Sequence, residues 1–339
     1  MMPAPSDRPA ARLDSLQLGR ALAAAAVVAH HAALASDAFT SESWGLLREL
    51  GSYGVDYFFV LSGFIIYYVH GSDPKNAYYA FIFMEKRIIR VYVPYLPISI
   101  AMIILYIALP TISQGGRDWG LVSSLTLLPM DSPPALNVAW TLVFEMIFYV
   151  IFALSYYTNC FLFASLVWPA LTLAINIIGF YSEITSPLWT HVFNLLILEF
   201  VAGVLMSFLF LRLPTAFWPV PTVAGVILSA IYFIVPPTHH IPFGLALAPL
   251  VLGLAQMETH YSLRLPGPIL LLGAASYAMY LVHSPLQSLL ARVLQPLDSW
   301  ILTFTACSVF GIVAGIAYHL LFERPMLRRL SRRTGSRSA

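Results

Sequence analysis

The sequence predicts an all-α integral membrane protein with about ten transmembrane helices and both termini in the cytoplasm. Of its 339 residues, 59% are hydrophobic and only 10% are charged, whereas soluble domains carry about 25% charged residues. The apolar residues gather in runs close to the roughly 20 residues that a helix needs to cross a bilayer. Lysine and arginine concentrate in alternate connections between these runs, as in the cytoplasmic loops of membrane proteins.

Ten apolar runs are the predicted spans. No small-residue cleavage site follows the first run, so we interpret it as a transmembrane helix rather than a removed signal peptide. The second and eighth runs are short and the turn at 157–160 is tight, so counts of nine or eleven helices stay open. The runs cover residues 16–36, 54–70, 92–112, 138–156, 160–180, 189–211, 217–235, 243–257, 268–290 and 300–322.

An even number of spans puts both termini on one side of the membrane, and the positive-inside rule selects the cytoplasm. The outer connections then hold few basic residues, namely Arg48, Arg117 and Arg292. We expect residues 76–95 to lie along the inner surface before the chain turns into the third span at Pro94. The inner segments hold Arg8, Arg12, Lys75, Lys86, Arg87, Arg90, Arg212, Arg264 and the arginine-rich C-terminal tail.

These limits divide the chain into three predicted parts. Residues 1–14 form a disordered cytoplasmic N-terminus, 15–325 a transmembrane domain and 326–339 a basic cytoplasmic tail. The net charge of +2 is too small to indicate a nucleic-acid partner. The two cysteines, Cys160 and Cys307, lie in apolar surroundings, so neither a disulfide framework nor a cysteine-based metal site is expected. We predict no metal site.

The first span carries an arginine and two histidines, although ionisable groups are costly inside a bilayer. Arg20 and His31 are eleven residues apart, which returns to within about 20° of the same helix face and separates them by about 16 Å along the axis. His30 falls about 80° away from that face. Two plainer interpretations stay open: Arg20 reaches the inner headgroups, and His31 is a neutral histidine bonded to a neighbouring helix.

Two further spans place ionisable groups at a depth similar to that of His31. Glu145 lies about 10 Å below the outer end of the fourth span, with Tyr149 on the same face one turn deeper. His283 lies some 22 Å from the inner edge in the ninth span. A carboxylate beside imidazoles suits a general base with an orienting partner. The alternative is a hydrogen-bonded cluster that only joins the helices.

A basic cluster, KRIIR, lies on the opposite, cytoplasmic side. Arg87 and Arg90 are three residues apart and therefore adjacent on a helix, and Lys86 precedes them. Pairing with anionic lipid headgroups is the default interpretation of such a run. Together with Arg20, these residues would instead hold a phosphorylated cytoplasmic ligand.

These segments resemble the signatures of the acyltransferase 3 family, in particular its exopolysaccharide-modifying branch. The similarity runs in order through nearly the whole chain. It departs where GR replaces the more usual RG before the first alanines, where Val93 precedes Pro94, and in the additional His30. The matching segments are LQLGRALAAAAVVAHH, YGVDYFFVLSGFII, KRIIRVYVPYL, WTLVFEMIFY, LEFVAGVL, SYAMYLVH and FERP.

The resemblance implies a membrane O-acyltransferase that moves an acyl group, with acetyl expected, from cytoplasmic acyl-CoA to a hydroxyl of a polysaccharide or glycolipid. It implies His31 as general base, Glu145 as its orienting partner or as a contact of the sugar, and His283 with Tyr280 as groups that position the acceptor or the oxyanion. Direct transfer and an acyl-histidine route stay open. The CoA phosphates are expected to bind Arg20, Arg87 and Arg90, and the substrate to contact Asp56, Trp140, Tyr149, Glu199 and Tyr280.

For Asp56 and Glu199, a purely structural role between helices is equally open. The same resemblance implies a multi-pass protein of the bacterial inner membrane. Its expected partners are acyl-CoA as co-substrate, a glycan or lipid-linked saccharide and membrane lipids, with no permanently bound cofactor.

Two rival functions remain open at this point. A transporter of a polysaccharide precursor would use the same ionisable groups as a proton relay, although the spans lack the paired broken helices of inverted repeats. A non-catalytic membrane scaffold leaves the buried charges unexplained.

Overall fold

The computed structural model describes residues 13–44, 51, 53–109, 118–157, 161–234 and 241–335, and within these ranges the regular structure is entirely helical. Each predicted span overlaps one long helix. Among the predicted residues, Arg8, Arg12, Arg48, Arg117 and Cys160 lie outside the described ranges. The long helices are α1 (Asp14–Phe39), α3 (Gly54–His70), α4 (Ala77–Ala108), α6 (Trp140–Leu154), α7 (Phe161–Ile177), α9 (Ile197–Phe210), α10 (Pro219–Ile234), α11 (Ile241–Tyr261), α12 (Gly267–Leu294) and α13 (Trp300–Tyr318).

Shorter elements join and extend these helices. The predicted span 189–211 is wrong as one continuous helix, because residues 193–196 separate a short helix from the long one. A second short helix, which the apolar runs did not predict, lies in the connection after α4, and the last long helix continues through a π-helical turn. The shorter elements are α5 (Leu121–Thr126), α8 (Pro187–Val192), α14 (Arg324–Gly335), the π-helical η6 (His319–Glu323) and the short 3₁₀ segments η2 (Asn137–Ala139), η3 (Phe180–Glu183), η4 (Thr215–Phe217) and η5 (Gln295–Leu297).

Length and hydropathy make this a multi-pass membrane protein. Within the described residues, six helical segments are long and apolar enough to cross a bilayer, and three further apolar helices are shorter. The outward faces are apolar too: Ile177 is 80% exposed and Ile234 is 76% exposed, which suits contact with lipid rather than water. The count of ten spans and the cytoplasmic location of the termini stay predictions, as do the proposed domain limits.

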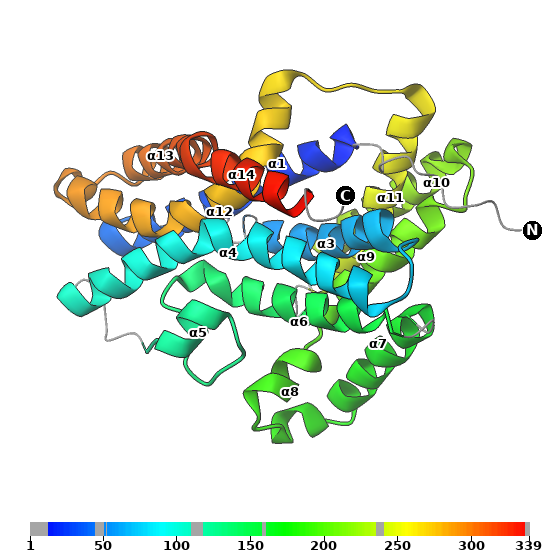
Figure 1. The fold of residues 1–339 in the computed structure, drawn as a ribbon. Coiled ribbons are helices and arrows are strands. Elements are labelled where there is room, and N and C mark those ends of the chain that lie inside the picture. Colours follow the sequence, from blue (N-terminus) through cyan, green and yellow to red (C-terminus); the bar gives the residue numbers. More distant parts are fainter. Residues whose placement is uncertain are drawn as a thin grey trace, which may run out of the picture.

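Helix α1 lies at the centre of the packing, flanked by α12, α13 and α3 (Figure 1). Its buried face consists largely of alanine and valine, including Ala24, Val28 and Ala32, and such small side chains let membrane helices approach closely. Gln287 on α12 fixes the arrangement, because its Nε2 donates to the carbonyl oxygens of Val28 at 2.9 Å and of Cys307 at 3.2 Å.

A carboxylate from a distant part of the chain caps the start of α1. Glu258 on α11 accepts hydrogen bonds from the backbone N–H of Asp14 at 2.6 Å and of Ser15 at 2.8 Å, and from the Ser15 hydroxyl at 2.6 Å. The first N–H groups of a helix lack partners within it and carry partial positive charge. This cap therefore fixes the height at which α1 enters the bundle.

Helix α4 runs without interruption from Ala77 to Ala108, so the predicted surface segment followed by a turn at Pro94 is wrong. Pro94 and Pro97 lack the N–H that would bond the carbonyls of Arg90 and Val93. Membrane helices tolerate such losses, and two tyrosines join this part of α4 to neighbouring helices. Tyr277 donates to the Val91 carbonyl at 3.0 Å and Tyr318 to the Pro94 carbonyl at 2.8 Å. The continuous helix carries the basic cluster towards α6 and α12, between which α4 lies (Figure 1).

Helices α3 and α9 cross in direct backbone contact at two glycines. A Cβ atom on Gly203 would lie 1.9 Å from the Val60 carbonyl oxygen, and one on Gly63 would lie 1.9 Å from that of Phe200. Only glycine permits so close a crossing, as small residues do at other membrane-helix contacts. The crossing matters for the cavity described below, because Phe200 lines that cavity together with several α3 side chains.

We predict that Gly203→Ala forces α3 and α9 apart and lowers the thermal unfolding temperature in detergent by several degrees. Overpacking of this kind costs about 1–3 kcal/mol. Gly267→Ala is the matched control, since a Cβ atom at Gly267 would meet nothing within 4 Å. Equal unfolding temperatures for the two variants would contradict the close crossing.

Candidate active site

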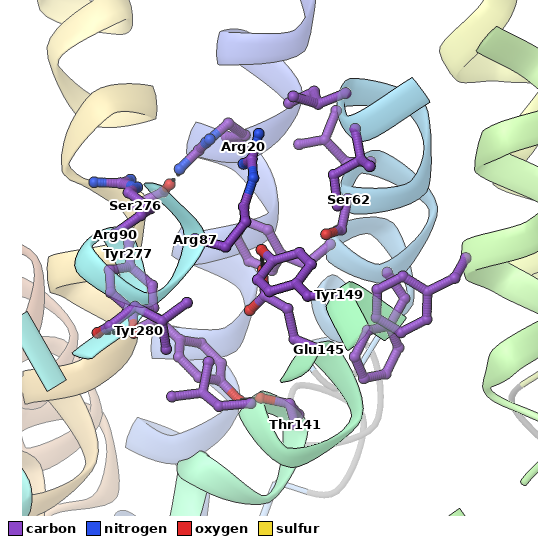
Figure 2. A pocket seen from close by; sticks show the side chains of 18 of the residues that line it. Arg20, Ser62, Arg87, Arg90, Thr141, Glu145, Tyr149, Ser276, Tyr277 and Tyr280 are labelled. Carbon is purple, nitrogen blue, oxygen red and sulfur yellow. Dashed lines mark hydrogen bonds between the residues drawn. The ribbon is translucent and has the colours of Figure 1, made fainter. Parts of the chain in front are cut away.

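One cavity lies among α1, α3, α4, α6 and α12, and it collects most of the polar residues singled out in the sequence. Its volume is about 140 Å³, several times the share of liquid volume that one water molecule occupies, about 30 Å³. Figure 2 shows Arg20, Arg87 and Arg90 on one side and Tyr280 with Thr141 on the other. The polar lining residues are Arg20, Ser62, Arg87, Arg90, Thr141, Glu145, Tyr149, Ser276, Tyr277 and Tyr280.

Glu145 lies with the arginines and not with the histidines. Its carboxylate accepts a hydrogen bond from the Tyr149 hydroxyl and interacts electrostatically with Arg87, Arg90 and Arg20. The helical spacing had placed Tyr149 one turn from Glu145, and this contact follows from it. Within the described structure no hydrogen bond joins Glu145 to His31, so the position of Glu145 fits substrate contact or charge balance better than orientation of His31.

Arg20 lines the cavity from α1 and is held there by a hydrogen bond to α12. Its Nε donates to the Ser276 hydroxyl at 3.1 Å, which ties α1 to α12. The neighbouring Gly19 lies against the Tyr57 ring. Because Ser276 carries no charge, it orients the guanidinium without neutralising it.

Arg87 and Arg90 both line the cavity, but their partners differ. Arg90 forms an ion pair with Glu323 in the π-helical turn. Arg87 donates from Nη2 to the Nε2 atom of His70 at 2.9 Å. Glu323 lies in the FERP segment, whereas nothing in the sequence links His70 to the basic cluster.

His31 of α1 and His283 of α12 contact each other where the two helices meet. The Nε2 atom of His283 lies 3.2 Å from Nδ1 of His31, and the ring centroids are 4.8 Å apart. The neighbouring His30 packs edge-on against His31 and its Cβ faces Gly51. The helical-phase argument that separates His30 from His31 thus agrees with their contacts.

The surrounding carbonyl groups determine the tautomers of this pair. Nδ1 of His283 lies 2.8 Å from the Met279 oxygen, and Nδ1 of His31 lies 3.1 Å from the Val27 oxygen. A carbonyl only accepts, so each Nδ1 must carry a hydrogen. In neutral rings, His31 then shares its one Nδ1 hydrogen between the Val27 oxygen and Nε2 of His283, and keeps a lone pair on its own Nε2. A base with an available lone pair is what proton abstraction requires.

Tyr280 connects the cavity to the histidine pair. It lines the cavity, and its ring centroid lies 6.0 Å from that of His283. Its hydroxyl donates to the Val138 carbonyl at 2.7 Å and lies 2.6 Å from the Thr141 hydroxyl. Because its hydrogen is engaged, Tyr280 suits positioning of an acceptor better than donation to an oxyanion.

Three predicted substrate contacts lie outside the lining of this cavity. Asp56 and Glu199 are buried between α3, α9 and α11, where the Glu199 carboxylate fills the space beside Gly244. Of the two roles left open, this position favours the structural one. Trp140 is 40% exposed at the start of α6 and packs edge-on against Phe144.

Sequence reasoning missed several polar residues that the structure brings to the cavity. Ser276, Tyr277 and Thr141 line it directly. All three lie within the matching segments WTLVFEMIFY and SYAMYLVH, so their place in these motifs was an available signal. Within the described residues, no group of three or more His, Cys, Asp or Glu side chains is arranged to hold a metal ion.

We predict that ¹⁵N NMR of histidine-labelled protein at neutral pH shows both His31 and His283 as Nδ1–H tautomers. The carbonyl contacts at each Nδ1 leave no other neutral arrangement. Spectra of His31→Gln and His283→Gln assign the two signals. An Nε2–H tautomer at His31 would remove the available lone pair and contradict this geometry.

Comparison with known proteins agrees with the architecture. A family model described as an acyltransferase domain matches residues 13–320. The chain is 30% identical over 314 residues to the exopolysaccharide production protein ExoZ of Rhizobium meliloti (strain 1021), covering 85% of this chain and 93% of that protein. It is also 30% identical, over 372 aligned positions, to the acyltransferase MdmB of Streptomyces mycarofaciens, covering 95% and 93%. No solved structure matches.

The matched domain spans most of the chain and includes both the arginines of the cavity and the histidine pair. The two relatives align over nearly their whole lengths. The protein therefore belongs to the acyltransferase 3 family of membrane O-acyltransferases.

Proposed function

We propose that the protein transfers an acyl group, with acetyl the expected one, from cytoplasmic acyl-CoA to a hydroxyl of a polysaccharide or glycolipid acceptor. The observation that carries this proposal is a cavity lined by three arginines and by Tyr280, whose ring lies 6.0 Å from that of His283 in the histidine pair, which is outside the lining. Guanidinium groups suit phosphates and imidazoles suit proton transfer. The name of ExoZ refers to exopolysaccharide production and so favours a glycan acceptor.

The spacing of Arg20 and His31 suits a donor with a long, thin arm. Arg20 and His31 lie on one face of α1, about 16 Å apart along the axis, which is close to the length that an extended pantetheine arm must cover. The alanines of α1 leave room for such an arm beside the helix. Because acyl-CoA is cytoplasmic, we propose that the arginine end faces the cytoplasm and that the protein resides in the bacterial inner membrane.

His31 is the proposed general base. Its Nε2 takes the proton of the sugar hydroxyl as the hydroxyl oxygen attacks the thioester carbonyl. The new C–O bond forms, the C–S bond breaks, and CoA leaves as a thiolate that is protonated to the thiol. His283 keeps the hydrogen of His31 on Nδ1 and so acts as a positioning residue. The same lone pair suits a route through an acyl-histidine, which acid-quench mass spectrometry of the enzyme with acetyl-CoA alone distinguishes.

We predict that His31→Ala lowers acetyl transfer by roughly 10²–10⁴-fold, the usual contribution of a general base, whereas His30→Ala keeps most of it. The assay supplies labelled acetyl-CoA to inside-out vesicles together with candidate polysaccharide or lipid-linked acceptors. His30 is the matched control, because it neighbours His31 but packs towards Gly51. Loss of transfer in His30→Ala with retention in His31→Ala would contradict the proposal. Movement of glycan without consumption of acetyl-CoA would favour a transporter instead.

We also predict that His283→Gln retains more activity than His283→Leu, by roughly twofold to tenfold. The glutamine oxygen can accept the Nδ1–H of His31, and one hydrogen bond contributes about 0.5–1.5 kcal/mol. Rates at saturating acceptor and the pH dependence of transfer are compared for the two variants. If Gln and Leu lower the rate equally, His283 does not act through the tautomer of His31.

A further inference from the structure

We propose that the two arginines of the basic cluster have different tasks: Arg87 contacts a phosphate of the acyl donor and is oriented by His70 and Asp73, whereas Arg90 joins helices. This inference deepens the proposed function and rests on it. In the sequence the two residues look equivalent, since both belong to KRIIR and lie side by side on one helix.

Arg90 is neutralised within the protein. Its Nη1 pairs with the fully buried Glu323, whose other carboxylate oxygen lies 2.7 Å from Nδ1 of His319. The guanidinium also lies over the Tyr277 ring, 5.4 Å from its centroid. The Arg90 side chain is 35% exposed, but its removal would leave the fully buried Glu323 carboxylate without this cation, which is destabilising. The task that follows for Arg90 is to join α4 to the π-helical turn after α13.

Arg87 is held by a neutral group instead. Nη2 of Arg87 lies 2.9 Å from Nε2 of His70, and Nδ1 of His70 lies 2.8 Å from Oδ2 of Asp73. A guanidinium only donates, so Nε2 must accept, which requires a neutral ring with its hydrogen on Nδ1, facing Asp73. His70 therefore fixes the direction of Arg87 and leaves its charge uncancelled.

Asp73 is suited to hold this imidazole. It lies between α3 and α4, outside the predicted spans, and also accepts a hydrogen bond from the Tyr156 hydroxyl at 2.7 Å. Partial burial raises the pKa of Asp73, but the hydrogen bonds from His70 and Tyr156 outweigh this and hold the pKa below its usual value. The carboxylate thus stays ionised at neutral pH and keeps accepting from His70.

The rest of the Arg87 guanidinium is available to a ligand in the cavity. Its guanidinium lies 5.4 Å from the Phe83 centroid and 5.7 Å from that of Tyr149, and it lines the cavity. Its Nε–H is buried and has no acceptor within the described structure. A buried donor without a partner is costly, and an anionic oxygen of a bound donor would satisfy it. With Arg90 neutralised by Glu323, the lining still carries Arg20 and Arg87 against one carboxylate, Glu145, which leaves it positive.

The test measures binding of CoA, and of pantetheine as the phosphate-free probe, to the purified full-length protein in nanodiscs by calorimetry. We expect wild type to bind CoA more tightly than pantetheine. Arg87→Gln should weaken CoA binding by roughly tenfold to a hundredfold, the range for a hydrogen bond to a charged group, and leave pantetheine binding unchanged. Arg90→Gln should instead lower the unfolding temperature more than Arg87→Gln does.

Two substitutions of His70 test its positioning role. Glutamine can place an acceptor where Nε2 was, and asparagine can place only a donor where Nδ1 was, so His70→Gln should retain more CoA affinity than His70→Asn. Equal CoA affinity in both variants and in wild type would overturn the role of His70 and Asp73. A selective loss of CoA binding in Arg90→Gln but not in Arg87→Gln would overturn the division of tasks. No CoA binding by wild type would overturn the acyl-CoA donor itself, and this inference with it.

Discussion

The close packing of α1 against α12 sets the geometry of the site at both ends. Near the start of α1, Arg20 is bonded to Ser276 of α12; eleven residues later, His31 meets His283 of the same helix. Between these contacts the buried side chains of α1 are mainly alanine and valine. Without them the two backbones would stand further apart, and neither contact would form.

Small residues and glycines therefore determine how closely these helices pack. In the hydrocarbon core, helices gain little from burying apolar side chains, because lipid is equally apolar, so association depends on close packing and a few polar contacts. Gln287 bonds α12 to both α1 and α13, and Gly203 brings α9 onto α3. These contacts fix the helices around the cavity, and the cap from Glu258 fixes the height of α1.

The three arginines of the site differ in the protein group that each of them contacts. Arg90 pairs with a carboxylate, Arg87 donates a hydrogen bond to a neutral imidazole and Arg20 donates one to a serine hydroxyl. A cation with a buried carboxylate partner contributes to cohesion, and a cation held by a neutral group keeps its attraction for an incoming anion. At the histidine pair, two backbone carbonyls impose the tautomers of His31 and His283. The backbone of α1 and α12 therefore sets which nitrogen of His31 is available as a base.

The sequence by itself determined the helical, membrane-embedded class, the positions of the long helices and the shared face of Arg20 and His31, because hydrophobic runs and helical phase are local properties. It also gave the depth of His283 well enough to pair it with His31. Tertiary structure alone decided the neighbours of Glu145, the continuity of α4 through Pro94 and the partners of Arg87 and Arg90. Depth along the membrane normal follows from residue spacing, but the lateral order of helices does not. For that reason Glu145, assigned from its depth to the histidines, lies with the arginines instead.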